Sequence, residues 1–210
     1  MFILASGSPS RKKLLDNALF PYKSITSDFD EDSIQNIDIK ELSKELSFKK
    51  AESVAHKIIS GKYSFSEDQD QIILLGCDSI FEFNGLAFGK PSSKEEAFKR
   101  WEMISSNCGF LHTGHSLIGL KANNKGNLII KESISGVVSS KVCFSKINKN
   151  EINYYINTEE PMTSAGGFKI EGIGGFYIEK IDGCYTNVMG LSLPWLRKNL
   201  TKIPHKKNSG

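Results

Sequence analysis

Residues 1–15, MFILASGSPSRKKLL, place groups suited to binding an anion at the start of a predicted helix. Ser8 stands at a natural N-cap position, and Pro9 follows at the first helical position, where a missing N–H costs nothing. Arg11 and Lys12 then add cations in the first turn, which is unfavourable beside the positive end of a helix dipole unless an anion binds there. Phosphate is the anion that such helix ends commonly hold. The alternative is an ordinary strand-to-helix turn with a solvated basic face.

An aspartate further along the chain is the sharpest candidate for catalysis. Asp78 follows the apolar run Ile72–Leu75, which is typical of a buried strand, so we expect it at the C-terminal end of that strand. Lys90 comes after the hairpin signal Asn84-Gly85, and the returning strand is expected to bring it near the same sheet edge. The alternatives are a strand-end aspartate bonded to loop N–H groups and a simple turn lysine.

Further carboxylates and lysines have types that suit a phosphate substrate. Asp30 and Glu31 lie in an acidic stretch and are ligands that Mg²⁺ takes together with phosphate oxygens. Lys50 lies in a predicted helix from which its ammonium group could reach a ligand. A solvated loop and a surface lysine are the alternatives. His112 and His115 are three residues apart on a predicted strand, so they face opposite sides and do not form a metal-ligand pair.

Apolar periodicity and turn residues predict the elements that must position these side chains. We expect strands over residues 2–5, 20–25, 72–75 with an extension over 80–83, 86–88, 110–120, 128–144 and 176–181. We expect helices from residue 9, over 39–59, from 92 or 93 to about 104, and over 149–157 and 193–200. Gly136 suggests a β-bulge in its strand, and the glycines of 165–175 indicate that the backbone approaches something closely there. This mixture predicts an α/β or α+β fold.

Composition excludes several classes of protein. The chain has 210 residues, of which 39% are hydrophobic and 24% are charged, so it is globular rather than disordered. Its net charge is +3, and residues 201–210 hold three lysines and no acid, so residues 1–200 balance at 24 basic against 24 acidic side chains. We therefore expect a disordered basic tail over 201–210 and no nucleic-acid surface.

The cysteines and the N-terminus indicate an intracellular environment. The four cysteines form no CxxC pair, which argues against a zinc site. Cys77 and Cys143 lie in apolar runs and are expected as reduced, buried thiols. The sequence shows no signal peptide and no apolar run approaching the roughly 18 residues of a membrane helix. We expect a soluble, cytoplasmic protein without membrane contacts.

Several separate motifs, in order from Phe2 to Leu200, give the chain a resemblance to the Maf family of nucleoside triphosphate pyrophosphatases, named after septum formation. The motifs are Leu4-Ala5-Ser6-Gly7-Ser8-Pro9 with Arg11, Asp30-Glu31, Lys50-Ala51, Cys77-Asp78-Ser79, Gly89-Lys90-Pro91, Thr113-Gly114, Ala165-Gly166, Glu171-Gly172, and Asn187 with Gly190-Leu191. The resemblance implies a single Maf/ITPase-like α/β domain over 1–200. In such a domain an elongated mixed sheet with flanking helices holds a central cleft between two lobes, commonly in a homodimer.

The resemblance also implies an activity and roles for residues. Members of the family cleave a nucleoside triphosphate between the α and β phosphates with a divalent metal, Mg²⁺ or Mn²⁺, giving a nucleoside monophosphate and pyrophosphate. By motif, Asp78 would be the catalytic acid-base residue, and Glu31 with Asp78 would position the metal. The triphosphate would be held by Ser8, Arg11, Lys50 and Lys90, with Lys12 added from its position.

The residues expected to choose the base depart from the familiar patterns. Ser10 stands where the pyrimidine branch has arginine, Ser79 where it has threonine, and Glu171 where it has glutamine. The run Phe168–Gly172 looks more like the branch acting on 7-methyl-GTP, which leaves the base open. Two other functions remain as alternatives: a nucleotide-binding regulator of cell division with little catalysis, and a pyrophosphatase for purine triphosphates such as ITP. The presence of Asp78 with its lysines favours the enzyme.

Overall fold

The computed structural model describes residues 1–34, 38–63 and 71–203, which form a mixed sheet with helices around it. The strands are β1 (Phe2–Leu4), β2 (Lys23–Ser24), β3 (Gln71–Phe83), β4 (Leu86–Phe88), β5 (Cys108–Ala122), β6 (Leu128–Phe144) and β7 (Ile178–Asp182). The helices are α1 (Pro9–Asn17), α2 (Ile39–Ile59), α3 (Lys94–Ile104), α4 (Lys149–Asn157), α5 (Tyr185–Val188) and α6 (Leu193–Leu200). Short 3₁₀ turns occupy Glu31–Ser33, Glu160–Thr163, Ala165–Gly167 and Ile173–Tyr177. The mixed α/β prediction is confirmed.

Most predicted elements are present where the sequence placed them. The helices expected over 39–59, 149–157 and 193–200 have those bounds, and α1 begins at Pro9 behind its Ser8 cap. The hairpin turn at Asn84 and Gly85 has positive φ at both residues, 50° and 77°, as a tight two-residue turn requires. The strand expected over 20–25 is reduced to the two residues of β2. The C-terminal tail prediction falls largely on 204–210, outside the described residues.

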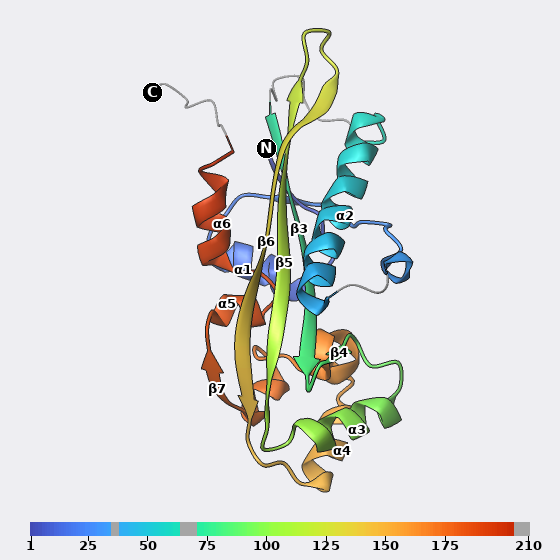
Figure 1. Cartoon of the computed structure of the whole chain (residues 1–210), viewed down its shortest axis with the longest axis vertical. Coiled ribbons are helices and arrows are strands. Elements are labelled where there is room, and N and C mark those ends of the chain that lie inside the picture. The colour runs from blue at the N-terminus through green and yellow to red at the C-terminus, as the bar shows by residue number, and fades with distance from the viewer. Residues whose placement is uncertain (35–37, 64–70, 204–210) are drawn as a thin grey trace.

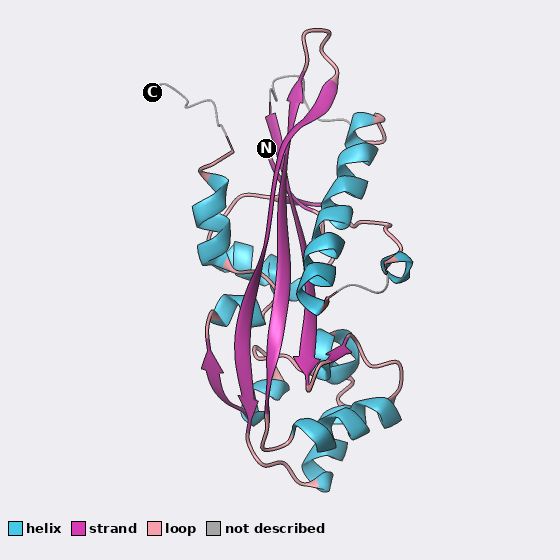
Figure 2. Cartoon of the chain, viewed as in Figure 1, coloured by secondary structure: helices cyan, strands magenta, loops and turns pink. Residues whose placement is uncertain are grey.

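The sheet is elongated because β3, β5 and β6 are long and paired with one another (Figure 2). The strand order is β2-β1-β3-β5-β6-β7, and β4 also pairs with β3. Strand β5 pairs with one edge of β3 from Gln71 to Glu82. Parallel β1 and antiparallel β4 share the other edge, where the pairing with β1 reaches Leu75 and the pairing with β4 begins at Phe81. Between these two residues this edge of β3 has no strand partner within the described chain. We call residues 76–80 the unpaired stretch.

Asp78 lies inside this unpaired stretch, in the middle of β3. The expectation that it ends a strand is therefore wrong. The neighbouring strand β1 stops at Leu4, but β3 continues because β5 pairs with its whole length. Asp78 still lies just beyond the C-terminal end of a parallel strand, which is β1 rather than its own.

Side chains alternate between two faces of the sheet, and helices cover each face (Figure 1). Helix α2 packs on one face through Ala51 and Val54, against Leu74 and Ile118. On the other face, α1 and α6 pack against Leu75 and Cys77, while α3 and α4 pack around Phe81. We call these the α2 face and the α1 face. Asp78 lies on the α2 face, and Ser79 lies on the α1 face.

Two glycines allow α2 to approach the sheet closely. A Cβ atom on Gly76 would lie 2.0 Å from the Ser47 carbonyl oxygen, and one on Gly114 would lie 2.0 Å from the Ser43 carbonyl oxygen. No such contact is tolerated, so these positions hold the N-terminal half of the helix against β3 and β5. Lys50 lies near the middle of α2, between Ser47 and Ala51, which both border Gly76.

The predicted bulge at Gly136 is wrong. The irregularity in β6 falls where Gly119 and Leu120 pair with Glu132 and Ile130, so that Lys131 is the extra residue. Gly136 pairs regularly with β5. A Cβ atom there would lie 2.9 Å from the Trp195 indole nitrogen, so the glycine makes room for a ring from α6.

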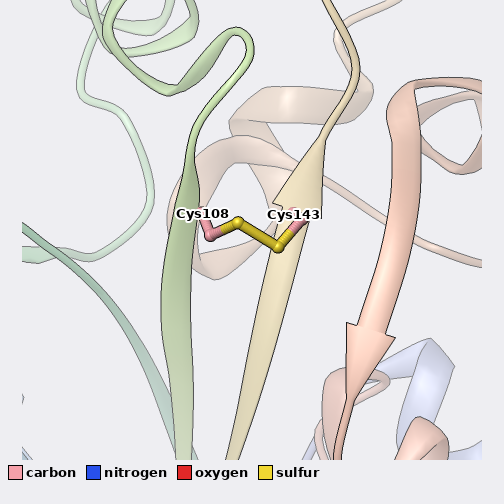
Figure 3. The surroundings of a disulfide bond; sticks show 2 residues. All are labelled: Cys108 and Cys143. Carbon is pink, nitrogen blue, oxygen red and sulfur yellow. A yellow bond between two sulfur atoms is a disulfide. The ribbon is translucent and has the colours of Figure 1, made fainter.

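The prediction that Cys143 is a reduced thiol is also wrong. Cys108 and Cys143 form a disulfide across β5 and β6, with Cα atoms 4.0 Å apart (Figure 3). They are 35 residues apart in sequence, and only the register of the hairpin places them opposite one another. Cys77 is free and buried, as expected, and burial raises the pKa of its thiol to about 11.

Candidate functional site

Three of the predicted site residues meet on the α2 face. The Lys50 ammonium group donates a hydrogen bond to Asp78 Oδ1 and lies 2.8 Å from Glu31 Oε1. The Lys50 and Asp78 side chains are only 13% and 10% exposed, whereas Glu31 lies on an exposed 3₁₀ turn. One lysine therefore bridges a buried and an exposed carboxylate beside the unpaired stretch of β3.

The environment of Asp78 makes its carboxylate a better proton acceptor than an exposed aspartate. Burial raises the pKa of Asp78 above its usual value, because a charged group is disfavoured away from water. The positive charges of Lys50 and Arg11 oppose this shift. A carboxylate with a raised pKa and a lysine partner is a common arrangement at catalytic sites.

The same two carboxylates fit a hard divalent cation. Oxygen atoms of Asp78 and Glu31 reach a single Lys50 ammonium group, so they converge on one small volume. The part of the chain described here contains no cluster of three His, Cys, Asp or Glu side chains. Mg²⁺ commonly binds through one or two carboxylates and completes its shell with water and substrate phosphate oxygens.

Arg11 is held by contacts inside the protein, and its predicted role at the phosphates stays a prediction. Its side chain is buried against the α1 face, with the residue only 9% exposed. The guanidinium donates to the Gly190 carbonyl at 2.8 Å, to Ser6 Oγ at 3.1 Å and to Ser79 Oγ at 3.2 Å. Three of its five N–H groups are thus used inside the protein. Arg11 links α1, β3 and the turn after α5, and two N–H groups remain for a ligand.

The other predicted phosphate contacts lie around the ends of β1 and β4. Ser8 caps α1, its hydroxyl accepting from the Arg11 backbone N–H at 3.5 Å. Within the described residues, neither the Lys12 nor the Lys90 ammonium group makes a hydrogen bond or ion pair, so both are available to an anion. Lys90 lies two residues beyond β4, whose last residue pairs with Phe81 next to the unpaired stretch. Ser10 is half-buried in the first turn of α1.

A series of hydrogen-bonded polar groups on the α1 face of β5 was not assigned a role from the sequence. Ser79 Oγ lies 3.0 Å from Thr113 Oγ1, which donates to the Asn187 carbonyl at 3.2 Å. Both Thr113 and Asn187 are fully buried. This series orients the Ser79 hydroxyl that Arg11 contacts. The sequence signal was a polar residue, Thr113, within a long buried strand.

The two histidines face opposite sides of β5, as predicted. His112 lies 2.8 Å from Glu82 Oε2 and 2.7 Å from Ser139 Oγ. His115 Nε2 accepts from the Ser192 backbone N–H at 2.8 Å, and burial lowers the pKa of its ring to about 3. Both histidines thus have structural partners.

Glu171 is half-buried and lies in a turn outside the helices and strands. This segment lies against the α1 face. Its neighbour Ile170 packs against both apolar clusters of that face, at their junction. A Cβ atom on Gly166 would lie 2.7 Å from Phe81 Cβ, which shows how closely this chain follows β3. Ser79 lies between Cys77 and Phe81 on the same face. The base-choosing candidates Ser79 and Glu171 are therefore on the α1 face, and Asp78 is on the other.

A hollow of about 420 Å³ lies elsewhere in the fold. Tyr154, Phe176 and Tyr177 line it, and none of the predicted site residues does. This hollow is not the central cleft that the resemblance implies, so that cleft stays a prediction. No helix in the described ranges is both long and apolar enough to span a bilayer.

Comparisons with known proteins find similar sequences over most of the chain. The model of the family described as "Maf-like protein" matches residues 1–203. A protein of Prochlorococcus marinus (strain MIT 9312) is 55% identical over 205 residues, which are 96% of this chain and 98% of that protein. One from strain MIT 9301 is 54% identical over 201 residues, 95% and 99% of the two chains. One from Synechococcus sp. (strain CC9605) is 42% identical over 195 residues, 93% and 98%. All three are named nucleoside triphosphate pyrophosphatase. With matching motifs, the expected α/β fold and relatives along its whole length, the chain belongs to the Maf family.

Proposed function

We propose that this protein is a nucleoside triphosphate pyrophosphatase, which hydrolyses its substrate to a nucleoside monophosphate and pyrophosphate. The observation that carries the proposal is the buried Asp78 carboxylate, bridged by Lys50 to Glu31 beside the unpaired stretch of β3. The names of the relatives support the same reaction. We propose Mg²⁺ or Mn²⁺ as the cofactor, held by Glu31 and Asp78.

In this mechanism Asp78 acts as the general base. A water molecule attacks the α-phosphorus, and its proton passes to the Asp78 carboxylate. The bond between the α-phosphorus and the oxygen that bridges to the β-phosphorus breaks, and pyrophosphate leaves with the electron pair. The raised pKa of Asp78 makes this proton transfer more favourable than it would be for an exposed aspartate. The metal, when bound, supplies positive charge to the phosphate oxygens.

Cationic side chains are proposed to hold the triphosphate. Its charge of about four negative units requires several cations besides the metal to stabilise the leaving group. Lys50 lies beside the carboxylates. The Lys12 and Lys90 ammonium groups have no partner among the described residues and are available for this task. The α1 N-terminus behind Ser8 adds backbone N–H groups. Arg11 is proposed to contact the phosphates through the N–H groups that its internal contacts leave over.

Base choice is proposed to depend on Ser10, Ser79 and Glu171. At neutral pH a carboxylate only accepts hydrogen bonds, and guanine offers two neighbouring donors, N1–H and the 2-amino group. A uracil or thymine edge offers one donor between two carbonyl acceptors, which a glutamine amide matches better. Glu171 therefore favours a guanine-like base, and a methylated, cationic guanine would also gain from its charge. The alternative is that Glu171 points away from the base.

A panel of canonical and modified triphosphates tests the function. With Mg²⁺ or Mn²⁺ the products should be the monophosphate and pyrophosphate, EDTA should abolish turnover, and returning the metal should restore it. Release of inorganic phosphate with a diphosphate would place the cleavage at the γ-phosphate and contradict the proposal. Binding without turnover of any triphosphate would instead favour a nucleotide-binding regulator.

We also propose that the protein is cytoplasmic and that it forms a homodimer, as the resemblance implies. Light scattering coupled to size-exclusion chromatography measures the mass in solution. A mass near the 23.3 kDa of one chain, at concentrations where the enzyme is active, would contradict the dimer.

A further inference from the structure

One carboxylate outside the predicted site holds the loop that carries Glu171. Glu160 Oε1 accepts from the Tyr155 hydroxyl at 2.8 Å and from the Gly174 backbone N–H at 2.9 Å. Its Oε2 accepts from the Ile173 backbone N–H at 3.0 Å. Tyr155 in turn accepts from the Lys169 backbone N–H at 3.3 Å. The backbone on both sides of Ile170 and Glu171 is thus tied to Glu160, directly or through one buried hydroxyl.

The loop also closes tightly around this carboxylate. A Cβ atom on Gly172 would lie 2.1 Å from Glu160 Oε2, so the residue next to Glu171 must be glycine while Glu160 is in place. The hydroxyl of Tyr155 would similarly lie 2.5 Å from a Cβ atom on Gly174. These two side chains therefore help to shape the path of residues 169–172 and the start of the 3₁₀ turn Ile173–Tyr177.

The chain before this loop is held by other groups. The Trp101 indole donates to the Gly167 carbonyl at 3.0 Å, and the Gly166 N–H donates to the Gly89 carbonyl at 3.1 Å. Losing the Glu160 carboxylate should therefore loosen residues 170–174 without releasing residues 166–167 or the segment next to Lys90.

We propose that Glu160 is a positioning residue for base selection, which acts by holding Glu171 at the place where it meets the base. This inference rests on the proposed function, because it deepens the role given there to Glu171. A carboxylate suits the task since it accepts at both oxygens and donates at neither, and three donors point at it. A glutamine of the same shape would turn an NH₂ group toward at least one of them.

Glu160→Gln is the test variant and Glu159→Gln is its matched control. Glu159 is the adjacent carboxylate, but it is exposed, and its ion-pair partner is Lys94 at 3.7 Å. For Glu160→Gln we expect the kcat/KM ratio between guanine-type and pyrimidine triphosphates to shrink by about five-fold or more, through KM, with kcat changed by less than about three-fold. Glu159→Gln should keep the wild-type ratio. A folded Glu160→Gln protein with an unchanged ratio would overturn the proposal.

Hydrogen exchange separates failure of this inference from failure of the proposed function. The Ile173 and Gly174 amides should exchange about ten-fold faster in Glu160→Gln than in wild type, whether or not any substrate is cleaved. Unchanged exchange at both amides would overturn the positioning role. If Glu160→Gln does not fold, Tyr155→Phe takes its place, because it keeps the buried ring and removes only the hydroxyl. Tyr155→Phe should then raise the exchange rate of the Lys169 amide and shrink the kcat/KM ratio between guanine-type and pyrimidine triphosphates. The proposal would be overturned if either of these two quantities stayed unchanged.

Discussion

Asp78 and Lys50 lie on a long strand and a long helix that pack directly against each other, whereas Glu171 lies on irregular chain tied by a few side-chain hydrogen bonds. The first pair is positioned by backbone pairing along β3 and by the close approach of α2 at Gly76 and Gly114. Glu171 depends on contacts from α4 and the turn after it. The proposed catalytic end is therefore built on regular elements and is rigid, while the position of Glu171 at the proposed base-reading end depends on a few hydrogen bonds.

The sharpest test of the catalytic end is Asp78→Asn, which keeps the shape and removes the basic oxygen. If Asp78 is the general base, the rate should fall by about 10²–10⁴ for every base alike. The fold should survive, since replacing a buried carboxylate of raised pKa by a neutral amide relieves desolvation. Steady-state kinetics with thermal melts measure both effects. Near-normal turnover would show that water is activated elsewhere, with Glu31 the next candidate.

A substitution beneath α2 tests the rigidity of that end. In Gly114→Ala the new methyl would lie 2.0 Å from the Ser43 carbonyl, so α2 must shift. We expect unfolding free energy to fall by about 1–3 kcal/mol or more. Gly89→Ala, where no atom lies within 4 Å of the added carbon, is the control for stability. Equal melting curves for the two variants would show that the close approach of α2 does not matter.

Glu171→Gln tests the base-reading end with the least change of shape. A good bidentate contact to a base discriminates by about 1–3 kcal/mol, roughly five- to 150-fold. We expect relative kcat/KM to move from guanine-type toward pyrimidine triphosphates by a factor in that range, with Asp78 chemistry unaffected. Competition assays with both substrate classes give the ratio directly. The same ratio in wild type and variant would mean that Glu171 does not read the base.

An effect on stability that appears only at acidic pH is expected from His115, which belongs to the rigid sheet. Its pKa is about 3 in the folded chain against 6.5 when exposed, so between these values the unfolded state binds more protons. Stability should fall as pH drops through this window, by about 1.4 kcal/mol per pH unit. His115→Gln should flatten that slope in thermal melts, whereas exposed His56→Gln should not. Parallel slopes for both variants would contradict the assignment.

The regular elements could be predicted from the sequence because their signals are local. Apolar periodicity and caps placed α2, α4 and α6 at their observed bounds, and the Asn84-Gly85 pair placed the hairpin. The residue types around Ser8, Asp78, Lys50 and Glu31 already indicate phosphate chemistry, and the resemblance to the family implies a role for each of them. These patterns concern neighbours within a few residues, which is the range over which propensity and periodicity act.

The remaining features depend on pairings between distant segments, which no local pattern encodes. Only the register of β5 with β6 joins Cys108 to Cys143. Only the sharing of one β3 edge by β1 and β4 leaves that edge without a strand partner at Asp78, whose other edge pairs with β5. Burial turned Arg11 inward, because its guanidinium found three acceptors from other segments. Likewise, the chain around Glu171 has no periodicity to read, and its path follows from the Glu160 carboxylate that lies against it.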